Sequence, residues 1–211
     1  MSFRLFSRPS RKELIEENNK LRKLVRTDSL TGIGNRNALD EDLKKYAEMF
    51  SREDREGHNY TDLVALFFDL DGLKAVNDLH GHNSGDDLIK MTSDIISSNI
   101  RATDSTYRLM KKDSQIDGYR LGGDEFVVLL YLNHPHSNPN MAEIFAKQAA
   151  HSFVGRVSRE FENTTFAKTG KKISVSVGTS TFRESESSID KMLHVADVRM
   201  QNNKDLKPER R

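Results

Sequence analysis

Asp69 and Asp124 are the residues whose type and position most directly suggest chemistry. Asp69 follows an apolar run at residues 63–68, and its length is typical of a strand buried on both faces. Asp124 lies between two predicted strands, residues 119–121 and 126–132, in a short connection typical of a β-hairpin. Either aspartate alone is more typical of a solvated turn. A function therefore depends on the fold bringing the two together.

A pair of such carboxylates near a phosphate would bind magnesium. Mg²⁺ prefers oxygen ligands and keeps waters or phosphates as further partners. In two-metal sites the ions lie about 3.5–4 Å apart and hold the attacking and leaving oxygens. The backbone carbonyl of Leu70 is a third candidate ligand. Gly122 and Gly123 would leave room for a large ligand against the hairpin, since a hairpin turn alone needs only one glycine.

The elements that must position these residues predict an α+β fold. After two leading helices, the order strand, helix, strand, strand, helix, strand, helix is typical of the ferredoxin-like β-α-β-β-α-β core, a palm or nucleotidyl cyclase-like antiparallel sheet flanked by helices. In that core the first strand and the hairpin are neighbours, so Asp69 and Asp124 would face each other. The last strand is expected at residues 173–177, and the last helix begins near residue 189 with Ser187 and Asp190 as its cap.

The composition limits the class of protein. Lys and Arg number 33 against 32 Asp and Glu, and this balance gives no reason to expect nucleic-acid binding through the overall field. The absence of cysteine excludes disulfides, thiolate metal sites and cysteine nucleophiles. No apolar run approaches the roughly 20 residues that span a bilayer, and the start lacks the apolar core of a secretion signal. We therefore expect a cytoplasmic protein without membrane contact, although the basic-apolar residues 3–12 could touch an acidic membrane surface.

Residues 10–26 predict a helix with a coiled-coil seam, preceded by a basic tail. Four residues alternate at four- and three-residue steps along it: Leu14, Asn18, Leu21 and Val25. A buried Asn in such a seam costs stability but fixes the register and favours a dimer. We expect residues 1–26 to form a tail and a dimerisation helix. The alternative is one amphipathic helix folded back on its own domain.

Five motifs follow in a fixed order. They are residues 28–36 (DSLTGIGNR), 68–86 (FDLDGLKAVNDLHGHNSGD), 120–126 (RLGGDEF), 176–178 (SVG) and 196–197 (AD). Together they resemble the GGDEF domains of diguanylate cyclases, with Leu73 where the family usually has Phe. The resemblance implies that residues 27–211 form a GGDEF catalytic domain, which joins two GTP molecules into cyclic di-GMP.

The resemblance also implies roles for the residues around the phosphates. Asp69 and Asp124, with the Leu70 carbonyl, would hold two Mg²⁺ or Mn²⁺ ions per active site. Asp124 or Glu125 would help to deprotonate the attacking 3′-hydroxyl, although metal coordination also lowers the pKa of that hydroxyl. The triphosphate would be held by the glycines of the hairpin, by backbone amides after the first strand and by one lysine, which could equally be a surface lysine: Gly122, Gly123, Asp71, Gly72, Leu73 and Lys74.

Guanine recognition is implied for Asn77 and Asp86. A carboxylate accepts from the two adjacent donors of guanine, and an amide can both donate and accept. Because adenine lacks those donors, Asp86 favours GTP. His82 lies near the base site by its place in the motif, but a helix-capping or packing role is an equal alternative. Each domain would hold one GTP, so two domains must meet, which implies a homodimer.

The chain departs from the family pattern at two places. Val198 and Asn202 stand where the family usually has Lys and Arg near the triphosphate, and Arg199 is one position off, which puts tight GTP binding in doubt. Lys204 matches a common family lysine. Arg101 and Asp104 fit the Arg-x-x-Asp pattern of the family's product-inhibition site, but an insertion before Arg120 separates them from the hairpin; the alternative is an ordinary Arg-Asp pair. The competing functions are a module that binds GTP or cyclic di-GMP without turnover, and a different nucleotide cyclase.

Overall fold

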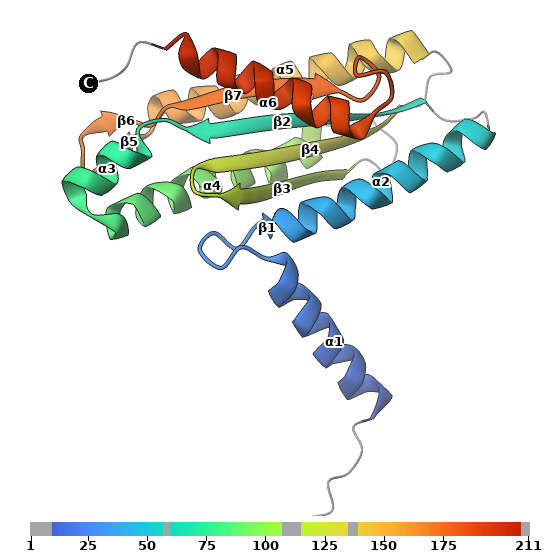
Figure 1. Ribbon diagram of the computed structural model, residues 1–211, viewed down its shortest axis with the longest axis horizontal. Coiled ribbons are helices and arrows are strands. Elements are labelled where there is room, and N and C mark those ends of the chain that lie inside the picture. The colour runs from blue at the N-terminus through green and yellow to red at the C-terminus, as the bar shows by residue number, and fades with distance from the viewer. Residues whose placement is uncertain (1–9, 57–59, 107–114, 135–138, 208–211) are drawn as a thin grey trace, which may run out of the picture.

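The computed structural model describes residues 10–56, 60–106, 115–134 and 139–207, and it contains a five-stranded sheet in the order β1-β3-β4-β2-β7 (Figure 1). A separate pair, β5 and β6, forms a small hairpin. The strands are β1 Gly34–Asn35, β2 Tyr60–Leu70, β3 Gln115–Gly122, β4 Glu125–His134, β5 Thr165–Phe166, β6 Lys171–Lys172 and β7 Val175–Thr181. The helices are α1 Arg11–Arg26, α2 Arg36–Glu56, α3 Leu73–His80, α4 His82–Thr106, α5 Pro139–Asn163 and α6 Ile189–Asp205.

The sheet confirms the predicted ferredoxin-like core. Four of its strands lie in the order β7-β2-β4-β3 and pair antiparallel, and only the short β1 adds a parallel pair with β3. The central strand β2 is buried on both faces, because each residue from Leu63 to Phe68 is at most 9% exposed. This burial explains why its apolar run does not alternate.

Two helical layers cover the two faces of the sheet (Figure 1). Alternate residues of β2, such as Val64 and Leu66, share one apolar cluster with residues of α4 and α5. Ala65 and Phe67 point to the opposite face and share a second cluster with residues of α2 and α6. The alternation of a pleated strand therefore assigns each helix pair to its face.

Helix α1 extends away from the rest of the chain (Figure 1). It begins with a capping box between Ser10 and Glu13, and none of its residues is buried. Its contact with α2 is an ion pair of Arg26 with Asp42 at 2.7 Å, beside a second one with Glu41. The predicted helix is confirmed, whereas the alternative of a helix packed on its own domain is not what the structure shows. No helix within the described ranges is long and apolar enough to cross a membrane.

The cap of α6 was predicted one residue too early. Ser188, not Ser187, is the N-cap, and its side chain accepts a hydrogen bond from the Lys191 amide at 3.3 Å. Ser187 adopts a positive φ of 55° and belongs to the preceding turn. The extended backbone of Ser188 has the conformation that an N-cap residue usually adopts.

Candidate active site

The fold brings Asp69 and Asp124 to one end of the central sheet. Asp69 is the penultimate residue of β2 and lies opposite Glu125, the first residue of β4. The Leu70 amide donates a hydrogen bond to the Asp124 carbonyl at 3.0 Å, which ties the end of β2 to the hairpin turn. The predicted neighbourhood of the two aspartates is thereby confirmed.

Both hairpin glycines are needed by the backbone itself. Gly122 has a φ of 145° and Gly123 has a φ of 52°, a region that side-chain-bearing residues rarely adopt. The expectation that the turn needs only one glycine is therefore wrong. A Cβ on either residue would meet no atom within 4 Å, so the space beside the turn is also open.

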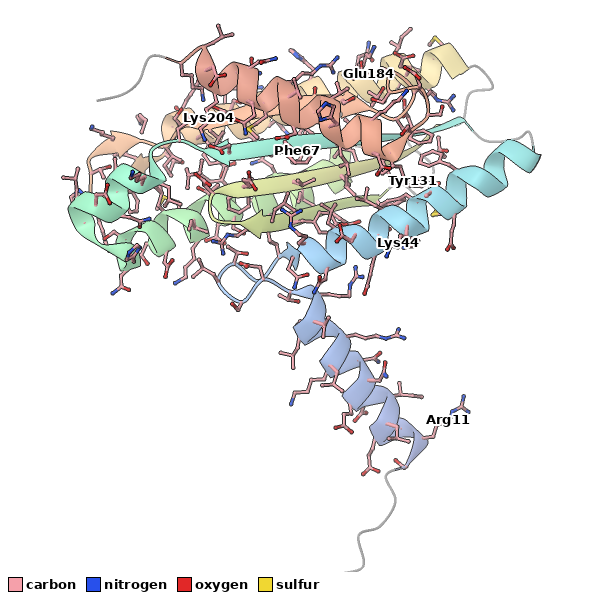
Figure 2. The ribbon with its side chains drawn as sticks, in the orientation of Figure 1. Arg11, Lys44, Phe67, Tyr131, Glu184 and Lys204 are labelled. Atoms are coloured by element: carbon pink, nitrogen blue, oxygen red, sulfur yellow. The ribbon has the colours of Figure 1, made fainter. Side chains whose placement is uncertain are left out.

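Negative charge accumulates around Asp69. This carboxylate is 4% exposed, and the Lys204 ammonium lies 2.8 Å from its Oδ1. Lys204 extends from the C-terminal half of α6 (Figure 2). Burial raises the pKa of Asp69, Lys204 opposes that rise, and the nearby Asp124 adds to it. Burial likewise raises the pKa of Glu125, with further contributions from Asp124, Asp69 and Asp197. Carboxylates held this close favour a bound cation.

The donor set fits magnesium better than a metal held by side chains alone. Within the part of the chain that the structure describes, no three His, Cys, Asp or Glu side chains are grouped to hold an ion. The available ligands are the carboxylates of Asp69 and Asp124 and the carbonyl of Leu70. Mg²⁺ is commonly bound by one or two carboxylates and completes its shell with waters and substrate phosphates. The residues present therefore fit the implied metal.

Asp71 anchors the loop that follows β2. Its carboxylate accepts hydrogen bonds from Ser174 Oγ at 2.5 Å, Ser176 Oγ at 2.9 Å and Lys207 Nζ at 2.6 Å. Burial alone would raise its pKa, but these three hydrogen bonds lower it. The loop then turns through Gly72, which has a φ of 78° and caps α3.

The side-chain role of Asp71 was not predicted, because the sequence suggested only its backbone amide. Lys207 was missed as well. It follows Lys204 by three residues, and that spacing of two lysines was the available signal.

The predicted base-reading residues lie together on α3 and α4. Gly85 packs so closely on Asn77 that a Cβ there would overlap Asn77 Oδ1, which places the amide against the residue that precedes Asp86. In the described residues, the side chains of Asn77, His82 and Asp86 have no hydrogen-bond partner. The next carboxylate, Asp87, is by contrast paired with Lys168 at 2.8 Å. His82 is exposed at the start of α4, so the structure gives no support to a packing role. Lys74, near the start of α3, is exposed as well.

Arg120 braces the hairpin turn. Its guanidinium contacts both Asp28 carboxylate oxygens at 3.2 Å and donates to the Gly123 carbonyl at 3.1 and 2.8 Å. Asp28 in turn accepts hydrogen bonds from the backbone and the hydroxyl of Thr31. The first motif of the chain thus supports the hairpin from a distance of 92 residues in sequence, a contact that the spacing could not predict.

Three positions of α6 bear on the charge expected beside the site: 198, 199 and 202. Val198 is 40% exposed, and Asn202 lines a groove between α5 and α6 with Lys147 and His151. Arg199 donates to the Thr179 carbonyl at 2.6 Å and so faces away from Asp69, as predicted. That positions 198 and 202 flank the phosphates stays a prediction.

The remaining prediction concerns Arg101 and Asp104. They lie in the last turns of α4, but their side chains fall outside the described part of the structure, as does the backbone of residues 107–114. An inhibitory site there stays a prediction.

Comparisons with known proteins agree with this geometry. The sequence matches the family model "Diguanylate cyclase, GGDEF domain" over residues 25–210. It is 31% identical over 192 residues to MucR of Pseudomonas aeruginosa, a bifunctional diguanylate cyclase/cyclic di-GMP phosphodiesterase, across 91% of this chain and 24% of MucR. It is 38% identical over 106 residues to the diguanylate cyclase DgcS of Shewanella oneidensis, across 50% of this chain and 30% of DgcS. The chain thus spans less than a third of the length of either relative.

A solved structure shows the same fold. The coiled coil and GGDEF domain of DgcB from Caulobacter crescentus, in complex with c-di-GMP, matches with a TM-score of 0.67 at 21% identity, covering 92% of this chain and 88% of that chain. The family model covers most of the sequence, and the geometry places its motifs around one site. The chain belongs to the diguanylate cyclase GGDEF-domain family.

Proposed function

We propose that this protein is a diguanylate cyclase that condenses two GTP molecules into cyclic di-GMP and releases two pyrophosphates. The observation that carries the proposal is the meeting of Asp69, the Asp124 turn and Lys204 at one end of the sheet. Two carboxylates beside a lysine suit a site that binds both a cation and a phosphate. We place the reaction in the cytoplasm, where its substrate is made.

The triphosphate is bound beside the end of β2. Backbone amides of Gly72 and Leu73 form its cradle. The predicted Asp71 amide donates instead to the Ser174 carbonyl at 2.9 Å, and with the side-chain bonds of Asp71 to Ser174 and Ser176 it holds this loop in place. Lys74 is exposed next to the loop and free to turn toward a phosphate. Gly122 and Gly123 keep the opposite wall of the site free of side chains.

Two Mg²⁺ or Mn²⁺ ions would be held by Asp69, Asp124 and the Leu70 carbonyl, and when bound they neutralise phosphate charge and lower the pKa of the attacking hydroxyl. The protein itself contributes position and electrostatics. Glu125 lies opposite Asp69, and its raised pKa suits a group that takes up a proton from the 3′-hydroxyl.

Guanine specificity rests on Asn77 and Asp86, with His82 beside them. Asp86 would accept from the N1–H and N2–H₂ donors of guanine, and the Asn77 amide would contact an acceptor. Because both side chains lack partners in the described residues, they can bind the base without first breaking a protein contact. Adenine would leave Asp86 without a donor, and such a mismatch is strongly disfavoured.

The reaction requires two copies of the domain. The 3′-oxygen of one GTP attacks the α-phosphorus of the other, the bond to the β-phosphate oxygen breaks, and pyrophosphate leaves in line with the attack. A second attack in the opposite direction closes the ring. A twofold homodimer supplies two facing half-sites for these two steps.

Helix α1 is the proposed dimerisation element, and residues 27–211 are the proposed catalytic domain. The predicted seam residues of α1 are available to a second copy, because Leu14, Leu21 and Val25 are 51%, 55% and 56% exposed. Leu14→Glu with Leu21→Glu should shift the dimer to a monomer in light scattering coupled to gel filtration. Glu16→Lys with Lys20→Glu, on the same helix but away from the seam and the positions that flank it, is the matched control. Dimers of unchanged affinity in the leucine variant would contradict the role of α1.

The function itself is tested by incubating the protein with GTP and Mg²⁺ and identifying the product by mass. Cyclic di-GMP is the expected product, and Mg²⁺ removal by EDTA should abolish its formation. Tight binding of GTP without any product would favour the alternative, a binding module without turnover. Inhibition by added cyclic di-GMP that disappears in Arg101→Ala would support the predicted inhibitory site.

A further inference from the structure

A ladder of three side chains joins the second half of α6 to β7. Arg199 Nη1 donates to the Thr179 carbonyl at 2.6 Å, Asn203 Nδ2 donates to the Val177 carbonyl at 2.7 Å, and Lys207 Nζ donates to the Val175 carbonyl at 2.7 Å. The donors are spaced by four residues along the chain, and the acceptors are spaced by two along the strand, in the opposite direction.

The spacing of the donors along the helix and that of the acceptors along the strand correspond to similar distances. Four residues of an α-helix rise about 6.0 Å, and two residues of a strand advance about 6.6–6.8 Å. A helix that runs antiparallel to a strand can therefore place one donor opposite each alternate carbonyl. Lys207 follows the last helical residue, and the Lys207 amide bonds to the Lys204 carbonyl at 3.1 Å, which continues the turn and the spacing.

The acceptors lie on the free edge of the sheet. Within the described residues, β7 is the last strand in the order and pairs only with β2, so the carbonyls of alternate residues there have no neighbouring strand to bond. Glu184 extends the ladder, because its Oε1 accepts from the Thr181 amide at 3.0 Å and from Arg199 at 2.6 Å. The edge is thus covered by side chains along most of its length.

Close packing at Gly178 makes this ladder possible. A Cβ on Gly178 would overlap the Ala196 carbonyl oxygen and the Met200 amide, so the α6 backbone rests directly on β7 at this residue. A side chain as short as Asn203 can reach the strand only from a helix this near. The glycine therefore sets the distance between α6 and β7, while the ladder sets the register along the strand.

The register decides where Lys204 points. Lys204 follows the middle donor Asn203 by one residue and reaches Asp69 of β2, the strand paired with β7, where Asp69 lies opposite Ser176. A slip of one residue along α6 turns each side chain by about 100°. Such a slip would aim Lys204 away from the carboxylate and carry Lys207 away from Asp71.

We propose that Arg199, Asn203 and Lys207 form a positioning ladder that registers α6 on the free edge of β7 and thereby holds Lys204 at Asp69. Its effect on GTP binding rests on the proposed function, whereas the docking of α6 does not. The ladder assigns a role to Arg199 and Asn203, for which the structure gives no contact with Asp69, Asp124 or the loop after β2 among the described residues.

Hydrogen exchange tests the docking without any substrate. In Asn203→Ala, the amides of the last two turns of α6 should exchange about tenfold faster, and Asn203→Asp, which sets an acceptor against the Val177 carbonyl, should have a larger effect. The matched control is Asn202→Ala, because that side chain is exposed and has no hydrogen bond within the described residues. Equal exchange in Asn203→Ala and Asn202→Ala would overturn the ladder.

A double-mutant cycle tests whether the ladder acts through Lys204. The affinity for a non-hydrolysable GTP analogue with Mg²⁺ should fall about tenfold in Asn203→Ala, and the same change should have no further effect in a Lys204→Met background. Equal losses in both backgrounds would show that Asn203 does not act through Lys204. If the unmutated protein bound no analogue, the proposed function would fail, and the exchange rates alone would still decide whether the ladder exists.

Discussion

The two ends of the candidate site differ in how their side chains are paired within the protein. At the phosphate end, Asp69 is paired with Lys204, and Asp71 is held by Lys207 and two serines. At the base end, Asn77, His82 and Asp86 have no side-chain partners among the described residues.

Burial accounts for the cation pairs at the phosphate end. The Asp69 carboxylate is 4% exposed and the Asp71 carboxylate is 21% exposed, so each needs a nearby cation to offset its lost hydration. At the base end Asn77 and Asp86 are half-buried and His82 is exposed, and none of them has an ion pair among the described residues. A cation or phosphate that binds at the phosphate end must therefore compete with the contact of Lys204 with Asp69.

The largest expected effect is at the hairpin turn. Asp124→Ala should lower cyclic di-GMP formation by at least about 10³-fold, since it removes a group that acts on transition-state charge. Its melting temperature should stay close to that of the unmutated protein, because the side chain is only half-buried. Asp78→Ala, an exposed aspartate on α3, is the control and should retain activity. Full activity in Asp124→Ala would contradict the catalytic role assigned to the phosphate end.

Protonation of a second buried carboxylate, Asp62, should make the stability of the fold depend on pH. In contrast to Asp69, Asp62 has no ion pair with a lysine among the described residues. Asp62 lies on the same strand and is 1% exposed, and in the described residues its Oδ2 accepts no hydrogen bond. Burial raises the pKa of Asp62 to about 7, against a partial opposing effect of Arg183.

The sign of the resulting pH dependence follows from this shift. Between about pH 4 and 7 the folded state keeps a proton that the unfolded state has lost, so stability falls as pH rises through this window, by roughly 4 kcal/mol in total. Asp62→Asn should remove this slope from the free energy of unfolding measured in urea. Parallel pH curves for the two proteins would show that Asp62 is neutralised by a partner after all.

At the base end we expect a smaller effect, which is a loss of GTP affinity. Asp86→Ala should weaken GTP affinity by about 10- to 100-fold, the scale of losing hydrogen bonds to a charged group. Asp87→Ala offers a matched control, since this adjacent carboxylate binds Lys168 instead. Calorimetric titration with GTP compares the two, and equal affinities would contradict the assignment of the base reader.

The smallest expected effect concerns the second lysine of the phosphate end. Lys207→Met removes the hydrogen bonds to Asp71 and to the Val175 carbonyl, and we expect the free energy of unfolding to fall by about 1–2 kcal/mol. Lys171→Met, at an exposed lysine of β6, should leave stability within about 0.5 kcal/mol. Thermal and urea unfolding of both variants measure this difference. A loss of equal size in both would contradict the anchoring role of Lys207.

Sequence patterns predicted the parts of the site that depend on strand order and local spacing. The apolar run before Asp69 and the glycine turn before Asp124 define adjacent strands of the core, so their meeting follows from the fold. The brace from Arg120 to Asp28 and the bonds between Asp71 and Lys207 join residues 92 and 136 positions apart. No periodicity links such residues.

Motif positions on α6 do not by themselves predict which side chains of the helix face the site. The packing of Gly178 on the backbone near Ala196 and Met200 orients α6. Lys204 then faces Asp69, while Asn202 lines the groove on the α5 side. A tertiary contact of one glycine thus decides which side chains reach the site.

The most direct test of the central claim is to supply GTP and ATP together with Mg²⁺ at a protein concentration that favours dimers, and to identify every dinucleotide by mass. We expect cyclic di-GMP as the product, with no adenine-containing dinucleotide, because Asp86 requires the donors of guanine. A mixed guanine–adenine product would contradict the base assignment, and the absence of any product would contradict the enzyme.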